Sequence, residues 1–357
     1  MGEGVAKADR EEGKNMDKRI SIRRPRSDDR PLWDVFFALN GSIAVYAAHK
    51  LKIFSLLAER AHTLPELCEA LKLAPRPAEA LLSISAAAGF VELREGRYGL
   101  TPLAEDYLVE SSTTYFGAHF ELPIGNDSLF TIGSVEKAAR TDSPQVYGGN
   151  DWMKSHEERA ELARGFTRSM HSASMAPAFA WPEMVDLSSN RAMLDIGGGS
   201  GAHCIGAVTR WPRLKATVFD IAPVCEVASE IAAKNGVENK VGTHVGDIWS
   251  DPFPAADLHF YSMIYHDWPP DKCRFLTAKS FASLPSGGRI VIHEMLFNDD
   301  RTGPYAVAAF NIAMLLWVTG QQYSGRELTN MLVEAGFKNI EAKPTFGYWS
   351  VVTGVKP

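Results

Sequence analysis

Long apolar runs, clustered cysteines and an excess of basic residues are all missing from this 357-residue sequence. No stretch approaches the roughly 18–20 consecutive apolar residues that a membrane-spanning helix needs, so we expect no membrane partner. The four cysteines lie far apart and form no CxxC pair, which predicts reduced thiols in a cytoplasmic protein. The net charge of -6 gives no electrostatic reason to bind a polyanion such as nucleic acid.

The first thirty residues combine charges of both signs with no apolar core. We therefore expect a flexible tail there rather than a signal peptide. The whole chain, with 45% hydrophobic and 22% charged residues, has ordinary globular composition, and its length suits about two domains.

The N-terminal third predicts helices followed by a hairpin. Apolar residues recur at helical spacing over 32–57, and Thr63 with Glu66 forms a capping-box pattern that opens another helix. A further helix is predicted over 76–88, and two short strands flank the turn at Glu95-Gly96. This order of elements is typical of a winged helix.

A winged helix often binds DNA, so a DNA-binding protein is one alternative. A recognition helix presents Arg, Lys, Asn or Gln to base edges, but the helix from Ala78 to Ala88 carries a single charge, Glu79. Its apolar surface favours packing against a second copy of the chain. We therefore expect a homodimer through the N-terminal region and no nucleic-acid partner.

From residue 188 onward, strands and helices alternate. Apolar segments at 192–196, 216–220, 258–264 and 289–294 predict strands separated by helical stretches. Such alternation predicts an α/β fold, with a doubly wound parallel sheet covered by helices on both faces.

The first of these strands ends in a glycine-rich turn, Gly197-Gly-Gly-Ser-Gly201, which lets the backbone approach a ligand closely. Asp195 precedes the turn, Asp220 ends the next strand, and Asp247-Ile248 follows a further strand-like stretch. No Lys or Arg lies within the turn, so a cationic ligand fits better than a pyrophosphate. The set predicts S-adenosylmethionine (SAM), with the three acids at its amino-acid portion, ribose and adenine. The alternative for each acid is a solvated residue at a strand end.

His266 follows the strand at 258–264, at the carboxyl edge where open parallel sheets bind ligands. An imidazole with an ordinary pKa of about 6.5 is suited to remove a hydroxyl proton near neutral pH. Glu294 ends the next strand, where it could hydrogen-bond the other ring nitrogen. The structural alternatives are a core histidine and a solvated acid.

The sequence resembles the SAM-dependent small-molecule O-methyltransferases typified by the plant caffeate, animal acetylserotonin and bacterial polyketide enzymes. The resemblance covers nearly everything after residue 30, and its most specific pieces are 194–201, His266-Asp-Trp and Glu294. It implies a Rossmann-like SAM-binding domain with an N-terminal winged-helix dimerisation domain. It also implies SAM as the cofactor, no metal and a homodimer.

The resemblance further implies roles for individual residues. His266 would be the general base and Glu294 its orienting partner. The cofactor would be bound by Asp195, Gly197, Gly199, Asp220, Asp247, Ile248 and Ser262. The acceptor would lie against Phe166, Met170, Ser174, Trp268, Met314, Gln322 and Tyr147.

We divide the chain into four parts on this basis. They are a flexible tail (1–30), a winged-helix-like dimerisation domain (31–115), a helical linker and acceptor-pocket region (116–187) and a Rossmann-like methyltransferase domain (188–357). A helical stretch over 157–180 bridges the two domains.

Two positions depart from the family pattern. Gln322 stands where the family often has a second acid beside the histidine, and Ser262 stands where a cofactor-contacting lysine is usual. An amide cannot stabilise an imidazolium by charge, which weakens His266 as a base. A thioether sulfur has no proton to lose, so S-methylation of an acceptor such as 4-methylthio-2-hydroxybutyrate, toward dimethylsulfoniopropionate, is an alternative with His266 orienting the acceptor. A SAM-binding relative that does not methylate is the second alternative; the sequence favours O-methylation.

Overall fold

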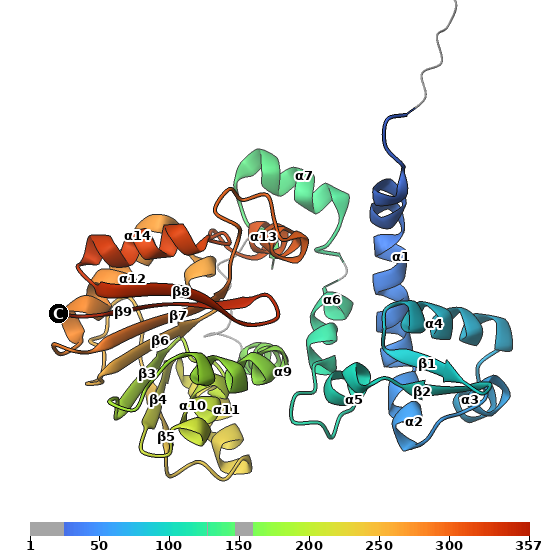
Figure 1. The fold of residues 1–357 in the computed structure, drawn as a ribbon, viewed down its shortest axis with the longest axis horizontal. Helices are drawn as coiled ribbons and strands as arrows, with labels where there is room; N and C mark the ends of the chain where they lie inside the picture. The colour runs from blue at the N-terminus through green and yellow to red at the C-terminus, as the bar shows by residue number, and fades with distance from the viewer. Residues whose placement is uncertain (1–24, 127, 147–159) are drawn as a thin grey trace, which may run out of the picture. The chain divides into compact units, whose positions relative to one another are not determined.

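The computed structural model describes residues 25–126, 128–146 and 160–357 (Figure 1). Up to residue 146 the elements are α1 (Arg30–Lys50), α2 (Ile53–Glu59), α3 (Leu64–Leu71), α4 (Pro75–Ala87), β1 (Val91–Arg94), β2 (Arg97–Leu100), α5 (Pro102–Leu108), η2 (Gly117–Phe120), α6 (Glu121–Gly125) and α7 (Ile132–Thr141). From residue 160 they are α9 (Ala160–Met184), β3 (Ala192–Ile196), α10 (Ala202–Arg210), β4 (Lys215–Asp220), α11 (Ala222–Lys234), β5 (Val241–Val245), β6 (Leu258–Ser262), η4 (Tyr265–Asp267), α12 (Pro270–Ser283), β7 (Arg289–Met295), α13 (Tyr305–Trp317), α14 (Gly325–Ala335), β8 (Lys338–Phe346) and β9 (Trp349–Val355).

The predicted capping box and hairpin are both present. Thr63 accepts from the Glu66 N–H, and the Glu66 carboxylate accepts the Thr63 N–H at 2.7 Å, which starts α3. Glu95 and Gly96 have φ of +50° and +75°, so they form a tight turn between the antiparallel strands β1 and β2.

The single helix predicted over 32–57 is wrong. Lys52 has a left-handed φ of +62°, and the chain breaks there into α1 and α2. The change of direction lets Ile53, Phe54 and Leu57 of α2 enter the core of the winged-helix region. The apolar residues keep their helical spacing across Lys52, but packing of these three side chains in the core ends the first helix there.

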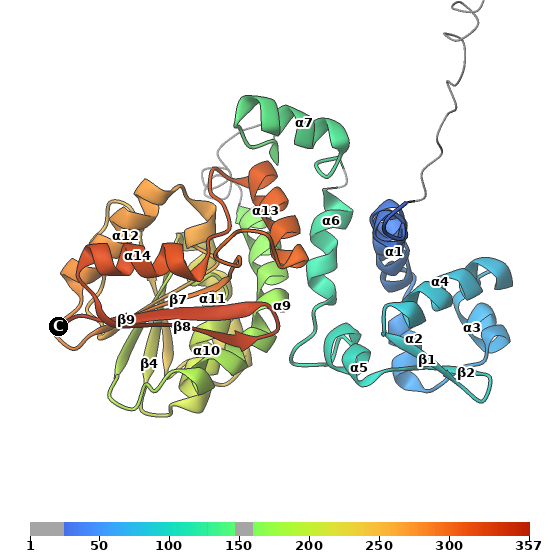
Figure 2. The same cartoon turned by 45° about the horizontal axis from the view of Figure 1, so that its top comes forward.

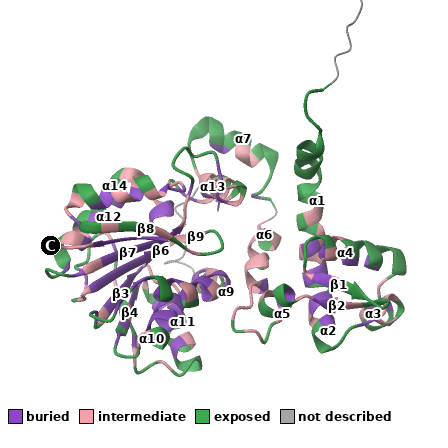
Figure 3. Cartoon of the chain, viewed as in Figure 1, coloured by how far each residue is buried: buried purple, intermediate pink, exposed green. Residues whose placement is uncertain are grey.

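The expectation that α4 packs against a second copy stays a prediction, but part of its apolar surface is used within the chain. Ala78 and Leu82 are fully buried within the region's own core, where Leu81 packs against them. Large exposed apolar side chains instead follow α1, which is coloured as exposed over most of its length in Figure 3. The chain divides into two units after Val45, so most of α1 belongs to the first unit.

Seven strands form the central sheet, in the order β5-β4-β3-β6-β7-β9-β8. The five strands from β3 to β7 run parallel, whereas β9 is antiparallel to β7 and β8 is antiparallel to β9. The four predicted strands are confirmed, and the strand-like stretch before Asp247 is β5. The C-terminal pair β8 and β9 is an addition to the prediction.

Helices cover both faces of this sheet (Figures 1 and 2). One face packs against α9, α10 and α11, and the other packs against α12 and α14. Because neighbouring residues of β3 face opposite cores, Leu194 in one and Met193 in the other, the strand is apolar throughout except at Asp195. The predicted doubly wound α/β sheet is confirmed.

The chain changes direction across the sheet at β3, which pairs with β4 on one side and β6 on the other. Open α/β sheets bind ligands at the carboxyl ends of the strands at such a point. The glycine-rich turn follows β3 and His266 follows β6, so both lie at this position.

Candidate active site

Glycine shapes the turn that follows β3. Gly197, Gly199 and Gly201 have φ of +67°, +55° and +74°, the left-handed region that favours glycine. Gly198 lies so close to Asp195 that a Cβ there would be 2.7 Å from the carboxyl carbon. The turn thus holds the backbone against the end of β3, and α10 begins directly after it.

Two acids lie beside this turn, the buried Asp195 and the half-buried Asp220. Asp195 is 1% exposed, and its Oδ2 accepts a hydrogen bond from the Cys204 thiol at 3.3 Å. Asp220, at the end of β4, accepts the backbone N–H of Gly199 at 3.0 Å and of Ile221 at 2.8 Å. Burial raises the pKa of Asp195 to about 7 and that of Asp220 to about 6.

This donor set fits a positively charged ligand. No Lys or Arg among the described residues forms an ion pair with Asp195 or Asp220. A pyrophosphate would place more negative charge beside these two carboxyls, whereas the ammonium and sulfonium of SAM would compensate them. The residues present therefore fit SAM.

The other residues predicted to bind the cofactor lie at the same edge with different contacts. Asp247 follows β5 and is exposed, and its carboxylate accepts the Trp249 N–H at 2.9 Å. Ile248 is buried in the core on the α12 face. Ser262 ends β6, and its hydroxyl lies 3.0 Å from Nδ1 of the buried His293. The cofactor roles of these three residues stay predictions.

His266 lies on η4, just after β6, and its ring is buried. Its Nδ1 is 3.0 Å from Nε2 of Gln322 and 3.3 Å from Oε2 of Glu294. Its Nε2 is 3.4 Å from Oδ1 of Asp267, and the Phe310 ring lies edge-on with 5.2 Å between ring centroids. The structure thus brings the predicted base and its predicted partner together and adds Gln322 at the same nitrogen.

His266 and Glu294 are not an ion pair at neutral pH. Burial lowers the pKa of His266 to about 3. Burial raises the pKa of Glu294 to about 8, although its Oε1 accepts the backbone N–H groups of Ile264 and Tyr265. The ring is therefore neutral, the form that can accept a proton, while the carboxyl is protonated.

The position of the ring hydrogen depends on the Gln322 amide. When the amide donates to Nδ1, the hydrogen of His266 is on Nε2 and points toward Asp267. When the amide is turned by 180°, its oxygen accepts from Nδ1–H and Nε2 is free to take a proton. The buried Oε1 of Gln322 and Oε2 of Glu294 have no hydrogen-bond partner among the described residues. Base catalysis by Nε2 requires the turned amide.

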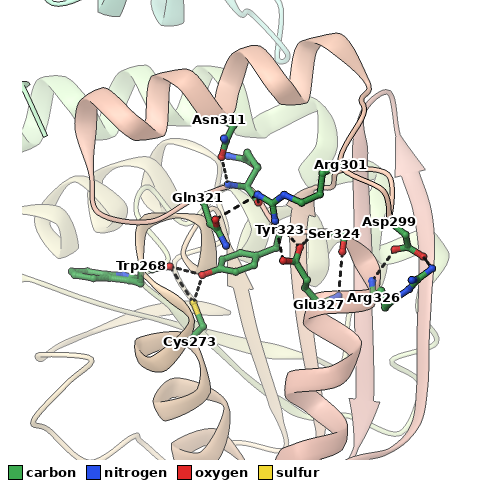
Figure 4. A network of polar contacts seen from close by, with 11 residues as sticks. Trp268, Cys273, Asp299, Arg301, Asn311, Gln321, Tyr323, Ser324, Arg326 and Glu327 are labelled. Atoms are coloured by element: carbon green, nitrogen blue, oxygen red, sulfur yellow. Dashed lines mark hydrogen bonds and ion pairs between the residues drawn. The ribbon is translucent and has the colours of Figure 1, made fainter. Parts of the chain in front are cut away.

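Gln322 belongs to the loop between α13 and α14, and Figure 4 labels its neighbours Gln321 and Tyr323. Its N–H donates to Oδ1 of Asn311 at 2.8 Å, and its carbonyl accepts from Arg301 at 3.3 Å. The hydroxyl of the adjacent Tyr323 donates to the Trp268 carbonyl at 2.7 Å. Backbone and side-chain contacts thus fix this loop on the segment that carries His266.

Gly320 makes the closest approach of this loop. A Cβ there would lie 2.2 Å from the His266 carbonyl oxygen and 2.3 Å from the Trp268 nitrogen. Gly320, Arg301 and Cys204 were not predicted as functional residues because no sequence motif marks them. The only signal was that Gly320 lies two residues before Gln322, the position that departs from the family pattern.

The residues predicted to contact the acceptor lie mainly on two helices. Phe166, Met170 and Ser174 are on α9, and Met314 is on α13. The rings of Phe166 and Trp317 have centroids 6.1 Å apart, which joins α9 to the end of α13. Their role in acceptor binding stays a prediction.

Two further residues predicted to contact the acceptor are Trp268 and Tyr147. Trp268 packs edge-on against Trp249, with 4.6 Å between ring centroids, and Trp249 directly follows the Asp247-Ile248 pair. This contact puts Trp268 beside the predicted adenine side of the site. Tyr147 lies outside the described residues.

Three observations bear on the expected absences. Over residues 25–126, 128–146 and 160–357, no three His, Cys, Asp or Glu residues gather in a way that could hold a metal ion. None of the helices within these ranges combines the length and the apolar character needed to cross a membrane. All four cysteines are buried and free.

Comparison with known proteins identifies the family. A family model described as an O-methyltransferase domain matches residues 135–338, and one described as an O-methyltransferase dimerisation domain matches residues 33–110. The 3-hydroxy-5-methyl-1-naphthoate 3-O-methyltransferase of Streptomyces sahachiroi is 34% identical over 315 residues, which cover 87% of this chain and 90% of that protein. Human acetylserotonin O-methyltransferase is 28% identical over 338 residues, which cover 88% of this chain and 94% of that protein.

The structural comparison agrees. The crystal structure of human N-acetylserotonin methyltransferase in complex with SAM superposes with a TM-score of 0.81 at 26% identity, covering 94% of this chain and 99% of that chain. The enzyme class and the cofactor predicted from the sequence are confirmed. The chain belongs to the O-methyltransferase family of SAM-dependent enzymes.

Proposed function

We propose that this enzyme transfers a methyl group from SAM to a hydroxyl of a small aromatic molecule, with His266 as the general base. The observation that carries the proposal is the buried, neutral imidazole at the carboxyl end of β6, with Glu294 and Gln322 at its Nδ1. The activities for which two relatives are named, a naphthoate and an acetylserotonin O-methyltransferase, support a hydroxylated aromatic acceptor.

The bound cofactor supplies a methyl group that its sulfonium has already activated. Asp195 holds the ammonium, and Asp220 accepts from the ribose hydroxyls. His266 takes the acceptor's hydroxyl proton on Nε2 while the oxygen attacks, and Gln322 fixes the ring through Nδ1. Apolar neighbours such as the half-buried Phe310 help exclude water and align the nucleophile.

Methyl transfer from labelled SAM to hydroxylated naphthoates, hydroxyindoles and simple phenols tests this proposal. His266→Ala should lower kcat by about 10²-fold or more, because the proton acceptor is lost. SAM affinity, measured by calorimetry on the same variant, serves as the control and should not change. Wild-type turnover that survives in His266→Ala would remove His266 from the mechanism.

S-methylation is the second candidate, and Gln322 is the observation that favours it. An amide lies where charge would stabilise an imidazolium, and a thioether acceptor needs no base. Gln322→Glu separates the two candidates. If oxygen is the nucleophile, the added acid should raise turnover and change its pH dependence. If 4-methylthio-2-hydroxybutyrate is the acceptor, the rate of its methylation should be nearly independent of pH. Gln322→Glu should then weaken only the binding of this acceptor.

We propose further that the enzyme is a homodimer through α1. Seven large apolar side chains of this helix are between 52% and 74% exposed: Leu32, Trp33, Val35, Phe36, Phe37, Leu39 and Ile43. A helix with so many exposed apolar residues is stable in water when a partner covers it. The match of residues 33–110 to a dimerisation domain supports this assignment.

The oligomeric state tests the role of α1. The double variant Phe36→Glu/Leu39→Glu should be monomeric in sedimentation experiments if α1 forms the interface. Val333→Glu is the matched control, because Val333 is 55% exposed on α14. A dimer that survives the double substitution would place the interface elsewhere.

We also propose that the enzyme acts in the cytoplasm. The four cysteines are all unpaired, as expected for a reducing compartment. Detection of the tagged protein in the soluble cytoplasmic fraction is the expected result, and recovery from a secreted fraction would contradict it.

A further inference from the structure

We propose that Cys204 is a positioning residue for the cofactor, because its thiol orients the Asp195 carboxyl toward the amino-acid portion of SAM. The inference rests on the proposed SAM site and adds to it a residue that no sequence motif marks. It assigns to a buried thiol a role in binding rather than in redox chemistry.

The geometry confines the Asp195 carboxyl from two sides. Cys204 lies in the first turn of α10, is fully buried, and places its Sγ 3.3 Å from Oδ2. On the other side, the backbone of Gly198 comes so close that a Cβ would be 2.7 Å from the carboxyl carbon. The side chain has little freedom to rotate, and the thiol determines which oxygen is engaged.

The hydrogen bond from Cys204 gives the two carboxyl oxygens of Asp195 different roles. Oδ2 accepts from the thiol, which leaves Oδ1 for the ammonium of the ligand. A hydrogen bond to a carboxylate is stronger than one between neutral groups, so the thiol stabilises the charged form. That form is the one that binds an ammonium.

The hydrogen bond from the thiol affects the pKa of Asp195, which burial and a neighbouring carboxyl also change. The pKa of Asp195 is raised to about 7, chiefly by burial; the Cys204 hydrogen bond lowers this pKa, and the nearby Asp220 carboxyl on β4 raises it. Burial and Asp195 raise the pKa of Cys204 well above its ordinary value, so the thiol remains a donor. SAM affinity should fall as the pH drops below the pKa of Asp195, and loss of the thiol should move this decline to higher pH.

The ligand itself offers an internal control. SAM and S-adenosylhomocysteine both carry the ammonium, whereas 5′-methylthioadenosine lacks the amino-acid portion. A residue that acts through Asp195 should affect the first two ligands and leave the third unchanged. A general disturbance of the glycine-rich turn would weaken all three.

The experiment compares Cys204→Val, which removes the donor at nearly constant volume, with Cys204→Ser, which keeps a donor. Dissociation constants of the three ligands are measured by calorimetry on the full-length enzyme between pH 6 and pH 8.5. Cys68→Val is the matched control, because Cys68 is a buried thiol in the winged-helix core. Cys204→Ala serves as a second donor-free variant if Cys204→Val does not fold.

We expect Cys204→Val to weaken SAM and S-adenosylhomocysteine about tenfold at pH 7 and to move the pH dependence upward. KM for SAM should rise more than kcat falls, and Cys204→Ser should restore most of the affinity. Wild-type affinity and pH dependence in both donor-free variants would overturn the proposal, and so would an equal loss for 5′-methylthioadenosine. A wild-type enzyme that binds none of these ligands would refute the proposed function itself, which is a different result.

Discussion

Gly320 is the residue at which the loop carrying Gln322 touches the backbone of His266. Gly320→Ala would place a Cβ 2.2 Å from the His266 carbonyl oxygen, so the loop or η4 must move. A displacement of the ring by about 1 Å is enough to lower kcat by roughly 10²-fold. Steady-state kinetics should show this loss with SAM affinity retained, since Gly320 is not among the residues predicted to bind the cofactor.

The matched control for this prediction is Gly133→Ala. No atom lies within 4 Å of a Cβ at Gly133, which is exposed on α7. This variant should keep wild-type kinetics. If Gly320→Ala also keeps them, the loop does not position His266.

At the scale of elements, the contact between α9 and α10 depends on one glycine. A Cβ at Gly206 of α10 would lie 2.0 Å from the Ala178 carbonyl oxygen of α9. Gly206→Ala should therefore destabilise the protein by about 1–3 kcal/mol, because two packed helices must separate. Urea denaturation followed by circular dichroism measures this cost.

Gly165→Ala provides the comparison on the other helix. Gly165 is exposed on α9, and nothing lies within 4 Å of its Cβ position. Alanine there should stabilise the helix by about 0.5–1 kcal/mol. If the two substitutions change the free energy of unfolding equally, the close approach at Gly206 does not contribute to stability.

At the scale of the whole molecule, buried histidines set the response to acid. Burial lowers the pKa of His203, His259 and His266 to about 3, and it lowers the pKa of His293 well below its ordinary value. The unfolded chain binds protons near pH 6.5, so the stability these neutral rings contribute is complete above that pH and is lost as the pH falls toward 3.

The buried acids act in the opposite direction. Asp195, Asp220 and Glu294 have raised pKa values, so the folded state binds more protons than the unfolded state between about pH 4 and their own pKa. Their stabilising protons are lost as the pH rises through 6 to 8. Below about pH 4 these three acids are protonated in both states and no longer oppose the histidines. The steepest loss of stability from these groups is therefore expected between about pH 4 and pH 3.

His203→Phe tests this account. Both ring nitrogens of His203 are buried without hydrogen-bond partners among the described residues, and the ring packs 5.2 Å from Phe260. Removing it should flatten the fall of the unfolding free energy by up to about 1.4 kcal/mol per pH unit between pH 6.5 and 3. Urea denaturation at a series of pH values measures the slope. The exposed His244, replaced by Phe, is the control, and an unchanged slope in His203→Phe would contradict the prediction.

The sequence by itself determined the α/β sheet and the residues at its carboxyl edge. Strands buried on both faces are apolar throughout, so they are visible as short runs such as 192–196. In a parallel sheet the residue that follows each strand reaches the same edge, which is why Asp195, Asp220 and His266 could be placed together from their spacing alone. Local pattern was sufficient wherever the signal lies within one strand and its turn.

Only the tertiary structure decided contacts between distant segments. The chain breaks at Lys52 because the core of the winged-helix region requires it. The strands β8 and β9 were missed because β8 is a largely exposed edge strand with polar residues. The contacts of Gln322 with His266 and of Cys204 with Asp195 depend on how a loop and a helix pack against strand ends. Spacing specifies which residues reach the edge of the sheet, but packing determines which atoms meet there, and these atoms decide the chemistry.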